Sequence, residues 1–305
     1  MSIVYKDKIG YLDYSIPINF NDGHIYPLDN FDKINSLMKE KTNEDRFFYP
    51  PIINTYRQHF EEVDGKLQIR EKLIPRTKRP AQVFKMYPSH EIQINKPMFA
   101  NDPRTNDGLF ITYLTAFMFG IRLQIHDWWI DGRVPVAINR DFVIQHSTLE
   151  EFIALAYRTW RSSSEKEKSL LNNLLYMQTR IKAYEWDWEK YMIAYMVFDG
   201  CFKCLDSAKK IPSQSHTKRM QFIIQYFDIE TNNEWIDSII KLRNNLFHEA
   251  LWGEGQHCFS GSTNTYRAML ILTKLNSRII VSLLGYKGKY TQSAWWKIDD
   301  SIAFF

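Results

Sequence analysis

The distribution of proline constrains the fold of this chain more than any other feature. Of its 11 prolines, all but Pro212 precede residue 147. Because proline breaks helices and central strands, we expect short elements separated by turns in the first half and long helices in the second. The sequence therefore predicts an α+β protein. We expect a β-rich domain of unknown role, a sensor or a substrate-recruiting unit, at residues 1–146, a helical domain at residues 147–286 and an aromatic tail at residues 287–305.

Short runs in the first half predict strands, because polar and apolar residues alternate in them with the two-residue period of a half-buried strand. These runs are residues 67–69, 81–86, 91–94, 121–125 and 133–138. Residues 109–120 form a longer apolar run, which is too short to cross a bilayer. We expect this run to be a buried helix inserted among the strands.

Helical periodicity dominates after residue 147 and predicts an antiparallel bundle of five or six helices. The expected helices lie around residues 148–160, 170–181, 186–209, 220–227, 231–253 and 269–283. Thr148 with Glu151, and Thr231 with Glu234, match a capping box, which marks the first turn of a helix. Gly285 is expected to cap the last helix.

The composition indicates a protein of a reducing compartment. The chain has only 3 cysteines, which does not suggest a disulfide framework. Residues 1–15 lack the apolar segment of a signal peptide. We therefore expect a cytoplasmic protein with no membrane partner. The net charge of +4 permits an anionic partner without requiring one.

The stretch LRNNLFHEA carries the residues with the clearest chemistry. Asn244 and His248 are four residues apart on an expected helix and so share a face. Arg243 lies about 100° around the helix, with a side chain long enough to reach His248. Such a set can cleave RNA without a metal. The guanidinium stabilises a negatively charged phosphorane, the imidazole moves protons near neutral pH, and the amide orients the groups.

Cleavage of this kind needs two proton transfers. A base removes the 2′-hydroxyl proton, the oxygen attacks the phosphorus, and an acid protonates the leaving 5′-oxygen. One histidine cannot easily perform both transfers, so the chemistry favours two copies of the chain that meet across a twofold axis. Glu249 and Asn245 are expected to support the site from the same helix.

The spacing of Arg243, Asn244 and His248, late in a helical bundle, resembles the signature of the HEPN family (the higher eukaryote and prokaryote nucleotide-binding domain). The resemblance covers residues 150–285, and a β-rich domain ahead of the bundle is similar to ApeA-like members. It implies a HEPN-type bundle and a homodimer with a composite active site. It also implies a metal-independent endoribonuclease that cleaves single-stranded RNA without a cofactor, in a toxin or phage-defence context.

A catalytically silent module is the alternative, since some members of the family have lost activity. Such a module would recognise a protein partner such as an antitoxin, a nucleotide or RNA. Basic residues near Pro212 are expected to contact the RNA backbone, whose phosphates attract them. These residues are Lys209, Lys210, Lys218 and Arg219.

Two further segments contain residues of similar type. Arg140 and His146 fit a looser version of the motif with one more residue between them, but residues 143–146 are expected to be extended, which would separate the two side chains. Residues 126–133 are rich in tryptophan and contain Asp131-Gly132. They predict either a platform for bases or, more simply, core residues with a tight turn.

Cysteine and histidine residues in the second half allow one alternative of a different class. Cys201 and Cys204 are spaced as in a zinc site, and His257 and Cys258 lie downstream. The first two fall on an expected amphipathic helix, where buried free thiols are common. We therefore expect thiols packed in a core rather than a metal site.

Overall fold

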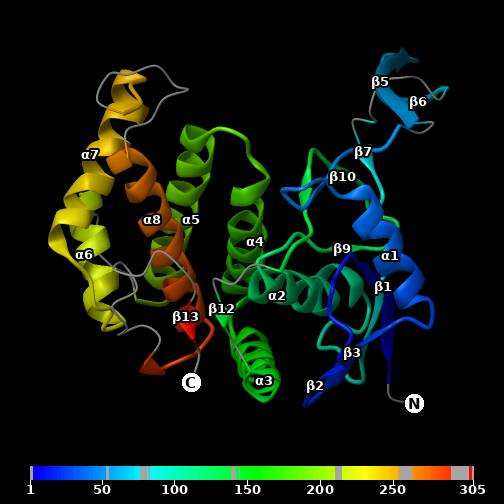
Figure 1. Cartoon of the computed structure of the whole chain (residues 1–305), viewed down its shortest axis with the longest axis horizontal. Helices are drawn as coiled ribbons and strands as arrows, with labels where there is room; N and C mark the ends of the chain where they lie inside the picture. Colours follow the sequence, from blue (N-terminus) through cyan, green and yellow to red (C-terminus); the bar gives the residue numbers. More distant parts are fainter. Residues whose placement is uncertain are drawn as a thin grey trace.

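The computed structural model describes residues 3–52, 55–75, 81, 83–138, 142–143, 145–209, 215–253, 263–289 and 302–303. Its sheets lie mainly in the first half of the chain and its long helices in the second, so the predicted α+β class is confirmed. Figure 1 shows the main sheet at one end of the molecule and the helices of residues 187–283 at the other.

The main sheet has five antiparallel strands in the spatial order β2-β3-β8-β1-β9. They are β1 (Tyr5–Gly10), β2 (Ile18–Phe20), β3 (Gly23–Pro27), β8 (His90–Ile94) and β9 (Gln124–Ile125). In the central strand β8, Ile92 and Ile94 are buried while Glu91 and Gln93 are partly exposed. This alternation is the pattern from which a strand at residues 91–94 is predicted.

Smaller elements surround the sheet. They are α1 (Phe31–Lys41), β4 (Phe47–Phe48), β7 (Val83–Phe84), β10 (Ile130–Asp131) and β11 (Val134–Pro135). A hairpin of β5 (Thr55–Val63) and β6 (Lys66–Ile74) projects from the body, as Figure 1 shows. Strands predicted at residues 81–86, 121–125 and 133–138 are shorter than expected.

In the C-terminal tail, β13 (Ile302–Ala303) pairs with β12 (Phe142–Val143).

The second half is helical, as predicted. Its helices are α3 (His146–Ser162), α4 (Glu165–Arg180), α5 (Asp187–Lys209), α6 (His216–Tyr226), α7 (Asn233–Glu249) and α8 (Thr263–Leu283), with a short 3-10 turn η2 (Ile181–Ala183) after α4. Each coincides with an expected helix. α5 packs between α4 and α8, and Gly285, with a φ of +92°, follows α8 as the expected cap.

Two predicted helix starts are wrong. α3 begins at His146 and is preceded by Gln145, so Thr148 lies inside its first turn and caps nothing. α7 is capped by Asn232, whose side chain accepts a hydrogen bond from the N–H of Glu234, rather than by Thr231. The residue before α3 is Gln145, three positions ahead of Thr148, and the cap of α7 is next to Thr231. Sequence spacing alone does not decide among such nearby candidates.

α2 (Leu109–Phe119), preceded by the π-helical turn η1 (Arg104–Gly108), is the expected buried helix. It packs against β9, α3 and α4, and so joins the sheet to the bundle. One buried apolar cluster continues from Tyr5 in β1 to Leu284 after α8. The domain boundary at residues 146–147 crosses this cluster and stays a prediction. Within the described ranges, no helix is long and apolar enough to span a bilayer.

His90, at the start of β8, lies in a buried chain of hydrogen bonds. Its Nδ1 lies 2.9 Å from Oγ of Ser89, and its Nε2 lies 2.8 Å from the carbonyl oxygen of Tyr14. Because a carbonyl only accepts, Nε2 carries the proton and Nδ1 accepts from Ser89. Oγ of Ser89 in turn accepts from the N–H of Leu12 at 3.0 Å. Burial lowers the pKa of His90 to about 4, because the charged imidazole would lose its hydration.

We expect acid to destabilise the protein through His90. The unfolded chain binds a proton there below about pH 6.5, whereas the folded protein binds it only near pH 4. The free energy of unfolding therefore falls as the pH drops through this window. Between pH 7.5 and pH 5 the loss from this group is about 2 kcal/mol, measurable by urea unfolding.

Matched histidine substitutions isolate this contribution. His90→Gln should reduce the pH dependence of unfolding by about that amount. His59→Gln, at an exposed position of β5, should leave it unchanged. An unaltered pH dependence in the His90 variant would show that His90 is not the group responsible.

Candidate functional site

α7 is an amphipathic helix that buries one side and exposes the other. Ile236, Ile239 and Leu242 recur at helical spacing and are buried in the core. The helix ends at Glu249, because Ala250 takes the left-handed conformation with a φ of 55°. The polar residues of the motif are consequently held on the outward side of the last two turns.

Arg243 reaches His248 along the exposed edge of this helix. Nη1 of Arg243 lies 2.6 Å from Nε2 of His248 and donates to Oδ1 of Asn244 at 3.1 Å. Because a guanidinium has donors only, Nε2 of His248 accepts and the imidazole proton lies on Nδ1. Arg243 is half-buried, and the other two residues are exposed. The structure therefore brings the three residues of the motif together.

Two aromatic rings line the guanidinium. Cζ of Arg243 lies 5.9 Å from the ring centroid of Tyr195 on α5 and 5.4 Å from that of Phe247 on α7. The two rings are themselves 6.0 Å apart. Cation–π attraction holds a guanidinium against such faces. Nε of Arg243 is buried and has no hydrogen-bond partner among the described residues, so the hydrogen bonds to Asn244 and His248 come from its outer end.

A second histidine lies beside this group. His216 is the first residue of α6, and its Nδ1 lies 2.9 Å from the hydroxyl of Tyr195. Oδ1 of Asp199, on the next turn of α5, lies 3.8 Å from the same nitrogen and 3.5 Å from Nη1 of Arg219. α5, α6 and α7 therefore converge at Tyr195, which contacts His216 with its hydroxyl and Arg243 with its ring.

The pKa of His216 is lowered below the ordinary value of an imidazole, and partial burial is the largest cause. The positive charges of Arg243 and Arg219, and that of His248 when it is protonated, lower it further, whereas Asp199 opposes them. Burial raises the pKa of Tyr195, so its hydroxyl stays protonated at physiological pH. The two histidines therefore share one electrostatic environment.

The motif alone does not point to His216, Tyr195 or Asp199. The sequence does indicate that Tyr195 and Asp199 lie together, because they are four residues apart in an expected helix and so share a face. The position of His216 depends instead on how α6 packs against α5 and α7, which helical periodicity does not specify.

The two residues expected to support the motif lie elsewhere. Asn245 lines a pocket of about 250 Å³, together with Trp235 and Thr265. Glu249 is exposed, and across the described part of the chain no hydrogen bond or ion pair joins it to His248. The structure brings neither residue to Arg243.

The four basic residues expected to contact RNA are only partly described. Lys218 is exposed on the first turn of α6. Arg219 is half-buried and packs over the ring of Phe202, with Cζ 5.2 Å from its centroid, beside Asp199. Lys210 and the side chain of Lys209 lie outside the described residues.

Residues 140–146, which contain Arg140 and His146, form no site in the described part of the structure. His146 is the first residue of α3, so the extended conformation predicted for it is wrong. Its Nδ1 lies 2.8 Å from the hydroxyl of Tyr14, and its Nε2 lies 3.3 Å from a carboxylate oxygen of Glu150. Arg140 lies outside the described residues.

One basic side chain lies over the ring of each tryptophan in residues 126–133. Cζ of Arg104 lies 5.7 Å from the ring centroid of Trp128, and Nζ of Lys85 lies 5.0 Å from that of Trp129. Gly132 has a φ of +64°, which confirms the expected tight turn. Trp129 is 48% exposed, so the turn agrees with the simpler interpretation, whereas a place for Trp129 in the core does not.

The cysteine pair is buried on α5. Burial raises the pKa of Cys201 well above its usual value, and it raises that of Cys204 to about 11, with a smaller effect from Glu167. Thiols that stay protonated are poor metal ligands and poor nucleophiles. Within the described residues, no three side chains of the metal-binding types come together; His257 and Cys258 lie outside them.

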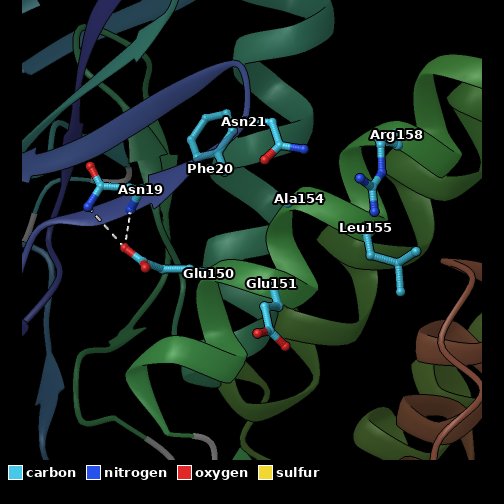
Figure 2. A pocket seen from close by; sticks show the side chains of 8 residues that line it. All are labelled: Asn19, Phe20, Asn21, Glu150, Glu151, Ala154, Leu155 and Arg158. Carbon is cyan, nitrogen blue, oxygen red and sulfur yellow. Dashed lines mark hydrogen bonds between the residues drawn. The ribbon is translucent and has the colours of Figure 1, made fainter.

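A larger open pocket lies between β2 and α3 (Figure 2). Its volume is about 710 Å³, and its lining residues are Asn19, Phe20, Asn21, Glu150, Glu151, Ala154, Leu155 and Arg158. Glu150 accepts a hydrogen bond from Nδ2 of Asn19 at 3.0 Å, which ties α3 to the sheet. The lining mixes carboxylates with one guanidinium, includes no residue of the motif, and contains no arrangement that points to a reaction.

Comparison of the chain with protein-family models, with curated proteins and with solved structures found no match. The interpretation of the site therefore rests on its own residues and geometry.

We expect the pKa of His216 to report on the arrangement of this site. Arg243→Gln should raise that pKa, because it removes a positive charge that repels the imidazolium. Asp199→Asn should lower it, because it removes a stabilising negative charge. NMR titration of the imidazole signals measures both changes, with exposed His59 as the internal reference. If neither substitution moves the pKa of His216, these charges do not lie around it as described.

Proposed function

We propose that this protein is a metal-independent endoribonuclease, which cleaves single-stranded RNA by attack of a 2′-hydroxyl on the adjacent phosphate. The observation that carries the proposal is the 2.6 Å contact between Nη1 of Arg243 and Nε2 of His248 at an exposed edge of α7. The contact joins a permanent cation suited to phosphate with an imidazole, a side chain that can serve as a general base. The resemblance of the motif to the HEPN signature supports the same conclusion, and a HEPN-type bundle belongs to the proposal.

In this mechanism the phosphodiester displaces His248 from the guanidinium. Arg243 then donates to the phosphate oxygens, and Asn244 keeps the guanidinium in place. Nε2 of His248 becomes free to accept the 2′-hydroxyl proton. The 2′-oxygen bonds to phosphorus as the bond between phosphorus and the 5′-oxygen breaks, and the leaving oxygen takes a proton from an acid in the composite site of the dimer. The products are a 2′,3′-cyclic phosphate and a 5′-hydroxyl.

The surroundings of the motif favour an anionic strand. Arg219 and Lys218 lie on the first turn of α6, next to His216. The same turn presents the amino-terminal backbone N–H groups of a helix, which attract phosphates. Asp199 pairs with Arg219 and offsets its charge, whereas Arg243 has no carboxylate partner among the described residues. The balance favours phosphate, and the requirement for a 2′-hydroxyl selects RNA.

A cytoplasmic homodimer with a composite active site is part of this proposal. Phe247 and Leu251, on either side of His248 in the sequence, are 42% and 38% exposed. Apolar side chains at the edge of a site are suited to burial by a second copy of the chain. A toxin or phage-defence effector held in check by an antitoxin-like protein fits an enzyme of this kind.

One feature of the contact favours the alternative of a silent binding module. While Nη1 of Arg243 occupies Nε2 of His248, the histidine cannot accept a proton. A protein that never releases this contact would only bind RNA, a nucleotide or a protein partner. Incubation with total tRNA or mRNA separates the two functions, because only the enzyme produces fragments.

We expect His248→Ala and Arg243→Ala to reduce cleavage of single-stranded RNA by about 10³-fold or more, because each removes a group that acts in the transition state. Arg243→Lys should recover little, since an ammonium cannot donate bidentately. Gel analysis of labelled RNA measures cleavage, and circular dichroism and sedimentation check folding and dimerisation. His59→Ala is the matched control and should keep full activity.

The substrate and the buffer provide two further controls. A 2′-deoxy substitution at the scissile nucleotide should block cleavage, because it removes the nucleophile, and EDTA should leave cleavage intact. Cleavage of the deoxy substrate, or a strict requirement for a divalent ion, would refute the mechanism.

A further inference from the structure

We propose that His216 is a second catalytic histidine, which protonates the leaving 5′-oxygen while His248 accepts the 2′-hydroxyl proton. This inference rests on the proposed ribonuclease function and adds a residue to its site. With His216, one protomer supplies both the base and the acid, whereas the motif by itself supplies only one histidine. A second copy of the chain is then not required as the proton donor, and its part in the proposed composite site is to complete the cleft.

The convergence of three helices at Tyr195 places the two histidines in one site. The Tyr195 ring centroid lies 5.7 Å from that of His216 and 5.9 Å from Cζ of Arg243. Arg243 in turn lies 2.6 Å from His248. Figure 1 shows α5, α6 and α7 gathered at the end of the molecule away from the sheet. Arg243 and His248 are also near enough to His216 to lower its pKa, so a strand bound to the guanidinium of Arg243 would lie near both imidazoles.

The hydrogen bonds of His216 leave Nε2 as the nitrogen that can donate a proton to a substrate. The protonated hydroxyl of Tyr195 lies 2.9 Å from Nδ1 and holds the ring in a fixed orientation. In the part of the chain that the structure describes, no hydrogen bond occupies Nε2. The side chain of His216 is 28% exposed, so part of the ring is accessible from solvent.

The charges that face His216 come from all three helices. Asp199 favours its protonated form, while Arg219 on α6 and Arg243 and His248 on α7 oppose it. A bound phosphodiester adds negative charge between the helices and engages Arg243. Substrate therefore shifts His216 toward the imidazolium that an acid needs, and Asp199 stabilises that imidazolium from behind.

The two histidines complete a balanced step. Nε2 of His248 takes the proton of the 2′-hydroxyl as the bond between the 2′-oxygen and phosphorus forms. The bond between phosphorus and the 5′-oxygen breaks, and its electron pair stays on that oxygen. His216 gives its Nε2 proton to the same oxygen. The enzyme gains one proton and loses one, and exchange with solvent restores both histidines.

A sulfur atom at the leaving position tests this role. A 5′-bridging phosphorothiolate RNA releases a thiolate, which leaves without a proton. On ordinary RNA we expect His216→Asn to slow cleavage by about 10²–10⁴-fold, the typical contribution of an acid catalyst. On the phosphorothiolate the same variant should cleave within about tenfold of wild type. His248→Asn, which lacks the base, should stay slow on both substrates.

Asparagine is chosen to replace His216 because it should preserve the fold. Its amide occupies the position of Nδ1 and can keep the hydrogen bond with Tyr195, and thermal unfolding checks the result. His59→Asn is the control for an unrelated histidine. Equal slowing of His216→Asn on both substrates, or no slowing on either, would overturn the inference while leaving the ribonuclease function intact. Failure of the wild-type protein to cleave ordinary RNA would instead overturn the proposed function, and this inference with it.

Discussion

The one-sided burial of α7 determines where the polar residues of this protein meet. Ile236, Ile239 and Leu242 fix the rotation of the helix, because turning it would expose all three to water. With the rotation fixed, Arg243 and His248 emerge along one outer edge, close enough for a 2.6 Å contact. The geometry of the candidate site is thus a consequence of the apolar periodicity of the helix that carries it.

Tyr195 connects this edge to the rest of the bundle. Its ring lies against Arg243 and its hydroxyl against Nδ1 of His216. Because Tyr195 is buried, both contacts have a rigid base. An active site requires this kind of support, since a catalytic group displaced by about an ångström loses much of its effect. The bundle therefore holds Arg243, His248 and His216 in place, and these side chains carry out the proposed reaction.

The sequence predicts the elements of the fold better than their packing. Proline distribution separates the strands from the helices, and the apolar run at residues 109–120 identifies α2 as a buried helix. Cap residues are less certain, because Asn232 rather than Thr231 begins α7. The choice between neighbouring caps depends on small differences in backbone conformation that spacing does not encode.

The same limit applies to the candidate site. Arg243, Asn244 and His248 belong to one helix, so local spacing is enough to predict their contact. His216 comes from another helix, and its approach depends on packing between α5, α6 and α7. Asn245 is adjacent to Asn244 in sequence but lines a different pocket, since neighbouring residues point about 100° apart on a helix.

The chemical nature of the ends of RNA fragments tests the central claim most directly. Attack by a 2′-hydroxyl leaves a 2′,3′-cyclic phosphate on one fragment and a 5′-hydroxyl on the other, and mass spectrometry identifies both. The account predicts these ends when the purified protein is incubated with single-stranded RNA. Fragments with 3′-hydroxyl and 5′-phosphate ends, or the absence of any fragments, would contradict it.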